Sequence, residues 1–202
     1  AEWTIRQGGR KLLVYAFGRE RYKPCVKELS TLQGDNLLRD APPDHLHHHA
    51  LMYAIRVNGL NFWEEVSGSG VQKPVASPPP ELGTNAAGLP QAILRQTLHW
   101  LAPQDAFLPD TPALALLVEQ RTLVLTVDPT RDEVALRWSA EFTVGGKTNT
   151  VVLEGSTYFG LGARFQSELD AVARHFHADG HPDLSGTRQD VSAHDWSAVA
   201  FD

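Results

Sequence analysis

The segment Val134-Ala135-Leu136-Arg137-Trp138-Ser139-Ala140-Glu141-Phe142-Thr143-Val144 decides the fold class of this chain. Polar side chains occupy alternate positions, and the positions between them carry the apolar residues Leu136, Trp138, Ala140, Phe142 and Val144. A period of two is typical of a β-strand that buries one face and exposes the other. The preceding segment repeats the pattern with Leu123, Leu125 and Val127, and residues 128–132 provide a turn between the two. The sequence therefore predicts two strands joined by a short turn.

Further strand signals lie on both sides of this pair. Residues 11–17, 22–29 and 50–57 are apolar or β-branched runs, and we expect a strand in each. Asn58-Gly59 is a dipeptide that two-residue hairpin turns favour, because both turn positions require a positive φ. We therefore predict a hairpin at this point, with residues 60–63 as its returning strand and one more strand at residues 149–153.

Only residues 163–177 have a helical pattern, in which apolar side chains recur three to four positions apart at Phe165, Leu169, Val172 and Phe176. About eight to ten strands against one short helix disfavour a parallel α/β fold, because that fold needs alternating helices. The sequence predicts an all-β fold, an antiparallel β-sandwich that forms a single domain over residues 1–202.

Two segments are expected to depart from regular sheet structure. Residues 67–90 are predicted to form a long surface loop, because Ser67-Gly68-Ser69-Gly70 and Ser77-Pro78-Pro79-Pro80 do not fit inside strands. Residues 195–202 resemble a strand that enters a sheet with no turn after it. We therefore expect the sandwich to be incomplete at its C-terminus, as in a fragment of a longer protein.

Composition and charge restrict the function classes. The formal net charge is −6 and Lys and Arg form no stripe, which disfavours nucleic-acid binding. No apolar run approaches the roughly 20 residues that a membrane span needs, so we expect a soluble protein. The single cysteine, Cys25, fits a reducing compartment. The chain begins at Ala1, so two locations stay open, the cytoplasm and, if a leader was removed, the periplasm.

The predicted functional centre is the turn Asp44-His45-Leu46-His47-His48-His49, which holds four of the nine histidines. The prolines of Ala41-Pro42-Pro43 give this turn a stiff entry. Imidazole moves protons near neutral pH and is also the commonest metal ligand. On an extended backbone, His45, His47 and His49 face one way and His48 faces the other.

Three roles for this turn follow from its chemistry. In the first, the protein binds or processes a small-molecule sugar or glycoside without a cofactor, and His45, His47, His48 and Glu119 are the catalytic acids and bases. In the second, His45, His47 and His49 bind a divalent metal, in a metal-binding protein or a metal-dependent enzyme. In the third, the histidines bond to loop carbonyls in a non-catalytic accessory domain.

Substrate binding is predicted for four residues, namely Asp44, Trp63, Arg121 and Arg164. Trp63 follows the hairpin and is a candidate platform for a sugar ring, and Glu64 and Glu65 come directly after it. Arg121 and Glu119 alternate with apolar neighbours, so both project to one face. They form either a structural ion pair or a clamp and a general base.

The histidine turn also carries a resemblance to a known family. Asp44-His45-Leu46-His47-His48, followed by Val57-Asn58-Gly59 and Phe62-Trp63, resembles the signature D-H-x-H-H…V-N-G-x-x-F-W of the PmoA-like family of uncharacterised soluble proteins. The similarity continues through Trp100, residues 119–123 and residues 159–165. The sequence departs from the family at His49 and Ala50, where Arg and Gly are usual. The family's C-terminal strands also have no counterpart after Asp202.

Residues 160–165, Gly-Leu-Gly-Ala-Arg-Phe, resemble a segment of galactose-mutarotase-like β-sandwiches as well. This resemblance implies a supersandwich that binds carbohydrate across a concave sheet through His, Arg, Glu and Trp side chains. It leaves epimerase, lyase and hydrolase chemistry open, because a fold does not fix a function. The PmoA name refers to a membrane subunit of methane monooxygenase, and a chain without a membrane span does not fit that role.

Overall fold

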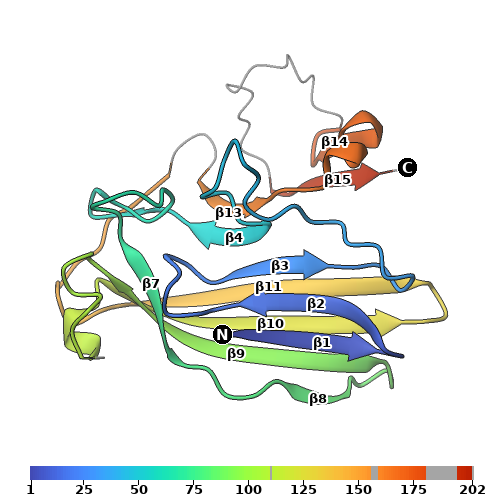
Figure 1. Cartoon of the computed structure of the whole chain (residues 1–202), viewed down its shortest axis with the longest axis horizontal. Helices are drawn as coiled ribbons and strands as arrows, with labels where there is room; N and C mark the ends of the chain where they lie inside the picture. Colours follow the sequence, from blue (N-terminus) through green and yellow to red (C-terminus); the bar gives the residue numbers. More distant parts are fainter. Residues whose placement is uncertain (110, 156–158, 181–194, 202) are drawn as a thin grey trace.

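The computed structural model describes residues 1–109, 111–155, 159–180 and 195–201, and two antiparallel sheets dominate them (Figure 1). The first sheet has the strand order β1 (Glu2–Gln7), β2 (Arg10–Ala16), β3 (Cys25–Leu29), β4 (Leu51–Ala54) and β13 (Gly160–Ala163). The second has the order β11 (Glu133–Val144), β10 (Leu117–Asp128), β9 (Pro90–Leu101) and β7 (Val71–Ala76), and β8 (Glu81–Thr84) also pairs with β9. The predicted all-β sandwich is confirmed.

Shorter elements complete the described part of the chain. A small sheet has the order β12 (Leu153–Glu154), β5 (Arg56–Val57) and β6 (Leu60–Asn61). A two-stranded ribbon joins β14 (Ala173–His177) to β15 (Ser197–Phe201). Two 3-10 helices, η1 (Pro112–Leu114) and η2 (Ser167–Val172), connect strands.

The alternating segment of residues 134–144 lies in β11, as predicted. This strand pairs with β10 from Leu117↔Val144 to Asp128↔Glu133, and the turn between them lies where the sequence placed it. Within β10, Leu123, Leu125 and Val127 are buried, whereas the apolar face of β11 is only half-buried. The difference arises because β11 is the edge strand of the second sheet, so its apolar face has neighbours on one side only.

The core lies between the two sheets and forms two clusters of buried side chains. The central cluster joins Leu12, Leu13 and Tyr15 of β2 to Leu94 of β9 and Leu123 of β10. The second cluster surrounds Trp100 and includes Met52, Phe62 and Trp63. Because Met52 and Trp63 also reach the histidine turn, this second cluster supports the candidate site described below.

A polar network crosses the core beside these clusters. Arg121, 1% exposed, donates hydrogen bonds from Nε to Glu119 Oε1 (2.6 Å) and from Nη2 to Glu119 Oε2 (2.9 Å). Its other donors reach Tyr15 Oη (3.1 Å) and Gln72 Oε1 (3.1 Å), and its guanidinium lies 4.5 Å from the centre of the Trp138 ring. Burial opposes the charge of Arg121, but Glu119 outweighs it and raises the pKa of Arg121. The pair is therefore a buried structural ion pair.

The hairpin at Asn58-Gly59 is confirmed. Both residues have positive φ, 50° and 76°, and β5 pairs with β6 on either side of them. Positive φ at both central positions is the requirement of a type I′ turn, whose twist matches that of the flanking strands. The hairpin sends the chain directly from β6 into Phe62 and Trp63.

Residues 67–90 are only partly a loop, so that prediction needs correction. Ser67–Gly70 and Ser77–Pro80 do lie outside strands, but β7 and β8 occupy the residues around them and both pair with β9. Pro74 is tolerated because β7 is an edge strand, and the register shifts between Pro74 and Ala76. The side chain of Gln72 then ties β7 to the first sheet through the carbonyl of Tyr53.

The predicted helix over residues 163–177 is present in a shorter form, as the 3-10 helix η2. At the expected start of the helix, Phe165 instead forms an isolated β-bridge with Leu38. The last residues of the predicted helix form β14. Residues 173–177 form a strand despite their helical spacing, because pairing with β15 satisfies the backbone hydrogen-bonding groups of both strands. The predicted terminal strand is β15, and Asp202 lies outside the described residues.

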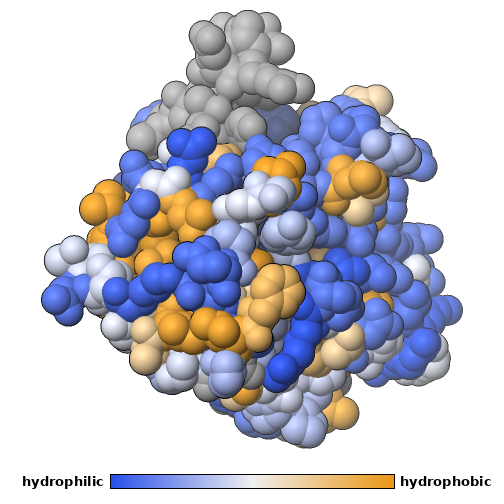
Figure 2. Space-filling view, turned by 60° about the vertical axis from the view of Figure 1, so that its left-hand side comes forward, coloured by the Kyte–Doolittle hydropathy of each residue, from blue (hydrophilic) through white to orange (hydrophobic). Residues whose placement is uncertain are grey.

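The surface mixes polar and apolar regions. The end of the sandwich that comes forward in Figure 2 carries apolar patches among hydrophilic ones. Phe107, 93% exposed, and Leu82, 75% exposed, are the most exposed large apolar side chains in the described residues. No helix in the described segments has the length and apolar character of a membrane span.

We expect Glu119→Gln to destabilise the protein by about 3–5 kcal/mol, because it leaves the buried charge of Arg121 without its anion. Urea unfolding followed by tryptophan fluorescence measures this change. The matched control is Glu141→Gln on the exposed face of β11, which should stay within about 0.5 kcal/mol of the wild type. Equal stability of Glu119→Gln and the control would contradict the structural role of the pair.

Candidate histidine-lined site

The backbone of residues 40–49 folds into a compact turn against the end of β13. Arg164, which follows β13, accepts a hydrogen bond from Arg39 N (2.9 Å) and donates its own N–H to Ala50 O (2.6 Å). Inside the turn, His45 N donates to Pro42 O and His48 N donates to His45 O. Both stems of the turn are thus held by one residue, which fixes the four histidines relative to the first sheet.

The turn borders a pocket of about 700 Å³. Side chains from the turn, β4, β13 and the segment after β6 line it, namely Asp44, His45, His47, His48, His49, Met52, Trp63, Glu64, Gly162, Ala163 and Arg164. This volume lies within the range of small-molecule sites, roughly 300–1,000 Å³. The structure therefore brings together six of the eight residues predicted for catalysis or substrate binding.

Two of the histidines form pairs with carboxylates at the pocket. His45 Nδ1 lies 2.8 Å from Asp44 Oδ2, and His47 Nε2 lies 3.3 Å from Glu64 Oε2. The hydrogen bond from His45 lowers the pKa of Asp44, so Asp44 is ionised and accepts the ring proton. Among the described residues, the opposite nitrogen of each ring, His45 Nε2 and His47 Nδ1, has no hydrogen-bond partner.

His48 has a different environment. Arg164 Nη1 donates to His48 Nδ1 at 3.1 Å, and Arg164 Nη2 lies 3.5 Å from Asp44 Oδ2. Burial, followed by the charges of His47, His45 and Arg164, lowers the pKa of His48 to about 4. His48 is therefore neutral at physiological pH, and because Nδ1 accepts from Arg164 its proton is on Nε2.

His49 points inward and belongs to a row of alternating charges that we call the buried quartet: Lys23, Glu65, His49 and Asp40. Lys23 Nζ lies 2.8 Å from Glu65 Oε1, which lies 3.0 Å from His49 Nε2, and His49 Nδ1 lies 2.8 Å from Asp40 Oδ1. Burial alone lowers the pKa of His49, but the bonds to Asp40 and Glu65 outweigh it and raise the pKa. Burial alone raises the pKa of Asp40 and of Glu65. Their hydrogen bonds to His49 outweigh burial, so the pKa of each carboxyl is lowered.

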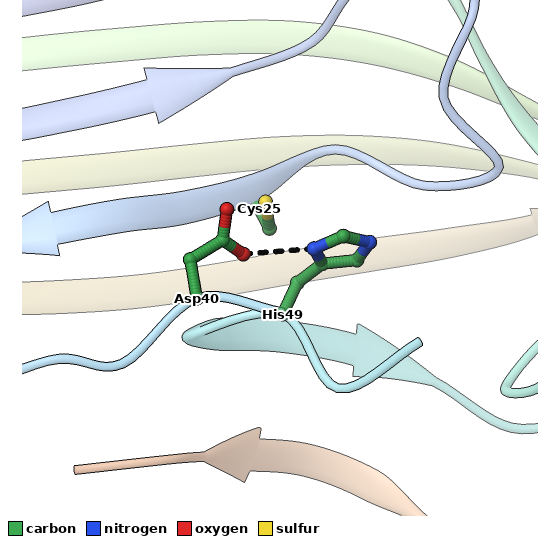
Figure 3. A group of neighbouring side chains, drawn as sticks. All are labelled: Cys25, Asp40 and His49. Carbon is green, nitrogen blue, oxygen red and sulfur yellow. Dashed lines mark hydrogen bonds and ion pairs between the residues drawn. The ribbon is translucent and has the colours of Figure 1, made fainter. Parts of the chain in front are cut away.

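Cys25, Asp40 and His49 place three donor atoms within 4.8 Å of one another (Figure 3). Among the described residues this is the one such group of His, Cys, Asp and Glu side chains. The donor chemistry does not fit a metal, because His49 donates from both ring nitrogens and has no lone pair to offer. Burial also raises the pKa of the Cys25 thiol to about 12, so the sulfur keeps its proton.

The predicted ligand set of His45, His47 and His49 is not assembled by the structure. His45 and His47 face the pocket, with ring centres 6.1 Å apart, but both nitrogens of His49 are held by the carboxylates of the quartet. The alternation expected for an extended backbone fails because residues 42–48 form turns. As a result all four histidines border the pocket, but both ring nitrogens of His49 are already bonded to Asp40 and Glu65.

Trp63 lines the pocket but does not offer the open platform expected from the sequence. Its side chain is 3% exposed, and Phe159 stacks on its ring at 5.4 Å between centres. A Cβ added at Gly162 would lie 2.9 Å from the Trp63 ring, so the absence of a side chain at this position lets the ring pack directly against β13. Gly162 is a site residue that the sequence signalled only through the Gly-Leu-Gly motif.

Glu119 and Arg121 are the two predicted site residues that the structure places elsewhere. Both lie in the polar network between the sheets, 0% and 1% exposed, and neither lines the pocket. They do project to one face of β10, as their alternation predicted, but that face is the core. No sequence pattern pointed to Lys23 and Asp40, which stabilise the turn through their ion pairs with Glu65 and His49.

A comparison with protein-family models matches residues 2–202 to a family of unknown function (DUF6807). The chain belongs to this family. Searches of curated proteins and of solved structures found no match. The family assignment leaves the function to be argued from the histidine-lined pocket.

We expect the stability gained from His49 to depend on pH. Its folded-state pKa is raised above the unfolded value, so its stabilisation is fully present below about pH 6.5 and is lost as pH rises through the folded pKa. Asp40 and Glu65, with lowered pKa values, lose their contributions only as pH falls below about 4. The stability difference between wild type and His49→Gln should therefore be largest between about pH 5 and 6.5 and shrink toward about pH 9.

Urea unfolding of both proteins across this range tests the expectation. His175→Gln, which changes an exposed histidine of β14, is the matched control and should show no such trend. A difference between wild type and His49→Gln that stays constant with pH would mean that His49 is neutral in the folded protein.

Proposed function

We propose that the pocket binds a small sugar or glycoside and acts on it by proton transfer. The observation that carries this proposal is the pair of imidazole–carboxylate units, Asp44–His45 and Glu64–His47, at one open pocket beside the guanidinium of Arg164. A carboxylate that holds one ring nitrogen of a histidine orients the other nitrogen for general acid–base work. Such groups suit a ligand with many hydroxyls, because they both donate and accept hydrogen bonds.

The shape of the pocket supports a ligand of sugar size. Its polar groups come from the histidine turn, Glu64 and Arg164, while Met52 and Trp63 provide an apolar wall. Sugars have polar hydroxyls and apolar C–H faces, so a pocket with one polar and one apolar side matches them. Gly162 also lines the pocket, and because it has no side chain the Trp63 ring lies directly against it.

The two sequence segments behind the resemblances meet at this pocket. Asp44–His48 belong to the motif of the PmoA-like family, and Gly162 and Arg164 belong to the segment similar to galactose-mutarotase-like sandwiches. A mutarotase-like supersandwich is therefore part of the proposal, and it favours carbohydrate over other polar ligands. The likeness is one of fold, so the argument for function rests on the pocket itself.

We expect sugars to stabilise the wild-type protein in a thermal-shift screen of hexoses, pentoses, uronates and methyl glycosides. A ligand at about 100 times its Kd adds about 2.7 kcal/mol to the free energy of unfolding. Arg164→Met and His45→Gln each remove a group at the pocket, and loss of a charged hydrogen bond weakens binding about 10- to 100-fold. Isothermal titration calorimetry gives the Kd of each variant.

The control for these variants is His175→Gln, which lies outside the pocket lining. It should bind the same sugars as the wild type does. The proposal fails if no sugar of the screen shifts the melting temperature, or if Arg164→Met and His45→Gln bind as tightly as the wild type.

A side chain at Gly162 is expected to weaken binding. The Cβ of Gly162→Val would collide with the Trp63 ring, so the ring or β13 must shift, and both line the pocket. We expect at least a roughly 10-fold rise in the Kd of any sugar found above. Gly83→Val is the matched control, because Gly83 is also in a strand and nothing lies within 4 Å of an added Cβ. Unchanged binding by Gly162→Val would place the ligand elsewhere.

A further inference from the structure

Both carboxylates of the pocket are engaged by histidines. Asp44 holds His45 and Glu64 holds His47, and the hydrogen bond from His45 lowers the pKa of the Asp44 carboxyl. Glycoside hydrolysis usually needs one protonated carboxyl and a second carboxylate across the glycosidic bond. The groups left to move protons are therefore imidazoles, which favours a reaction at carbon over hydrolysis.

The position of Arg164 narrows the chemistry further. Its guanidinium lies beside the same Asp44 that orients His45, at 3.5 Å, and is held from the other side by His48 Nδ1 at 3.1 Å. A base next to a fixed cation is the arrangement that proton abstraction beside a carbonyl requires, because the negative charge moves from carbon to the carbonyl oxygen. Asp44 contacts both this cation and His45, which makes His45 the candidate base, and His47 is the second imidazole, 6.1 Å from His45 between ring centres.

We infer that, if the proposed sugar-binding role holds, the pocket takes sugars with a carbonyl next to a hydroxyl-bearing carbon, such as open-chain ketoses, and moves the proton on that carbon. His45 Nε2 takes the proton, the C–H electron pair forms the carbon–carbon double bond of an enediolate, and the carbonyl π pair moves to oxygen. Arg164 donates hydrogen bonds to that oxygen. Protonated His47 then returns a proton to carbon, the carbonyl forms again, and no oxidant or reductant is consumed.

His48 acts in this scheme as a positioning residue. It accepts a hydrogen bond from Arg164, and since it is uncharged at neutral pH it holds the guanidinium without repelling it. The reacting groups thus come from the histidine turn and from Arg164 at the end of β13. Their arrangement depends on the backbone hydrogen bonds of Arg164 to Arg39 and Ala50.

Proton NMR in deuterium oxide tests the inference, with D-fructose, D-tagatose and D-xylulose as probes. Wild-type protein should replace the proton on the carbon next to the carbonyl by deuterium. Methyl β-D-glucopyranoside has no free carbonyl, so it should keep its protons even where it binds. His45→Gln is expected to lower the exchange rate by at least about 100-fold, which is the size of a general-base contribution.

His47→Gln gives a sharper expectation. His45 still removes the proton and returns solvent deuterium to the same carbon, so exchange should continue while the isomerised or epimerised sugar no longer forms. His48→Leu, which removes the acceptor for Arg164, should lower kcat with little change in KM, and His48→Gln, whose amide oxygen accepts, should restore part of kcat. His175→Gln should behave as the wild type in every assay.

The outcomes separate this inference from the proposed function. Ketoses that bind to the wild type without taking up deuterium overturn the inference and leave sugar binding intact. Absence of any sugar binding overturns both. Exchange by His45→Gln at the wild-type rate overturns the assignment of the base, and hence the inference, whatever the binding data show.

Discussion

The histidine turn depends on the buried quartet of Lys23, Glu65, His49 and Asp40. These four groups come from the β2–β3 connection, the segment after β6 and both ends of the turn, so one row of charges ties three parts of the chain together. Removing a charge from water costs several kcal/mol, and only a neighbour of opposite sign offsets it. Any rearrangement that separates one member leaves its partner unpaired, which restricts the turn to one conformation.

This restriction divides the histidines between two tasks. His49 stabilises the turn, and it is protonated because both of its ring nitrogens face carboxylates. With His49 fixed inside, the tight turns at Pro42 and His45 direct His45, His47 and His48 outward around the pocket. His49 is structural, as the accessory-domain prediction expected of the histidines, but its partners are the carboxylates of Asp40 and Glu65 rather than loop carbonyls. The other three histidines line the pocket.

The sequence predicted elements whose signal is local. Alternation over residues 134–144 gave β11, and Asn58-Gly59 gave the hairpin, because each pattern reflects a property of a few neighbouring residues. It did not predict that Ala173–His177 would leave a helical pattern for a strand, since β15 lies outside that window. The same holds for the site: His45, His47 and Arg164 were marked by their type and motif, whereas Lys23 and Asp40 gain their role only from partners distant in sequence.

Burial distinguishes two carboxylate–arginine pairs that consist of the same kinds of group. Glu119 with Arg121 and Asp44 with Arg164 both pair an acid with an arginine, and both were candidates for substrate contact. Arg121 donates to Tyr15 and Gln72, and Glu119 accepts from Trp100. Both side chains are buried, so neither presents a donor or acceptor to solvent. Asp44 is 59% exposed and Arg164 29%, and their remaining hydrogen-bonding capacity faces a pocket. Of the two pairs, only the second is open to solvent, and this is why we place the proposed chemistry at the histidine turn.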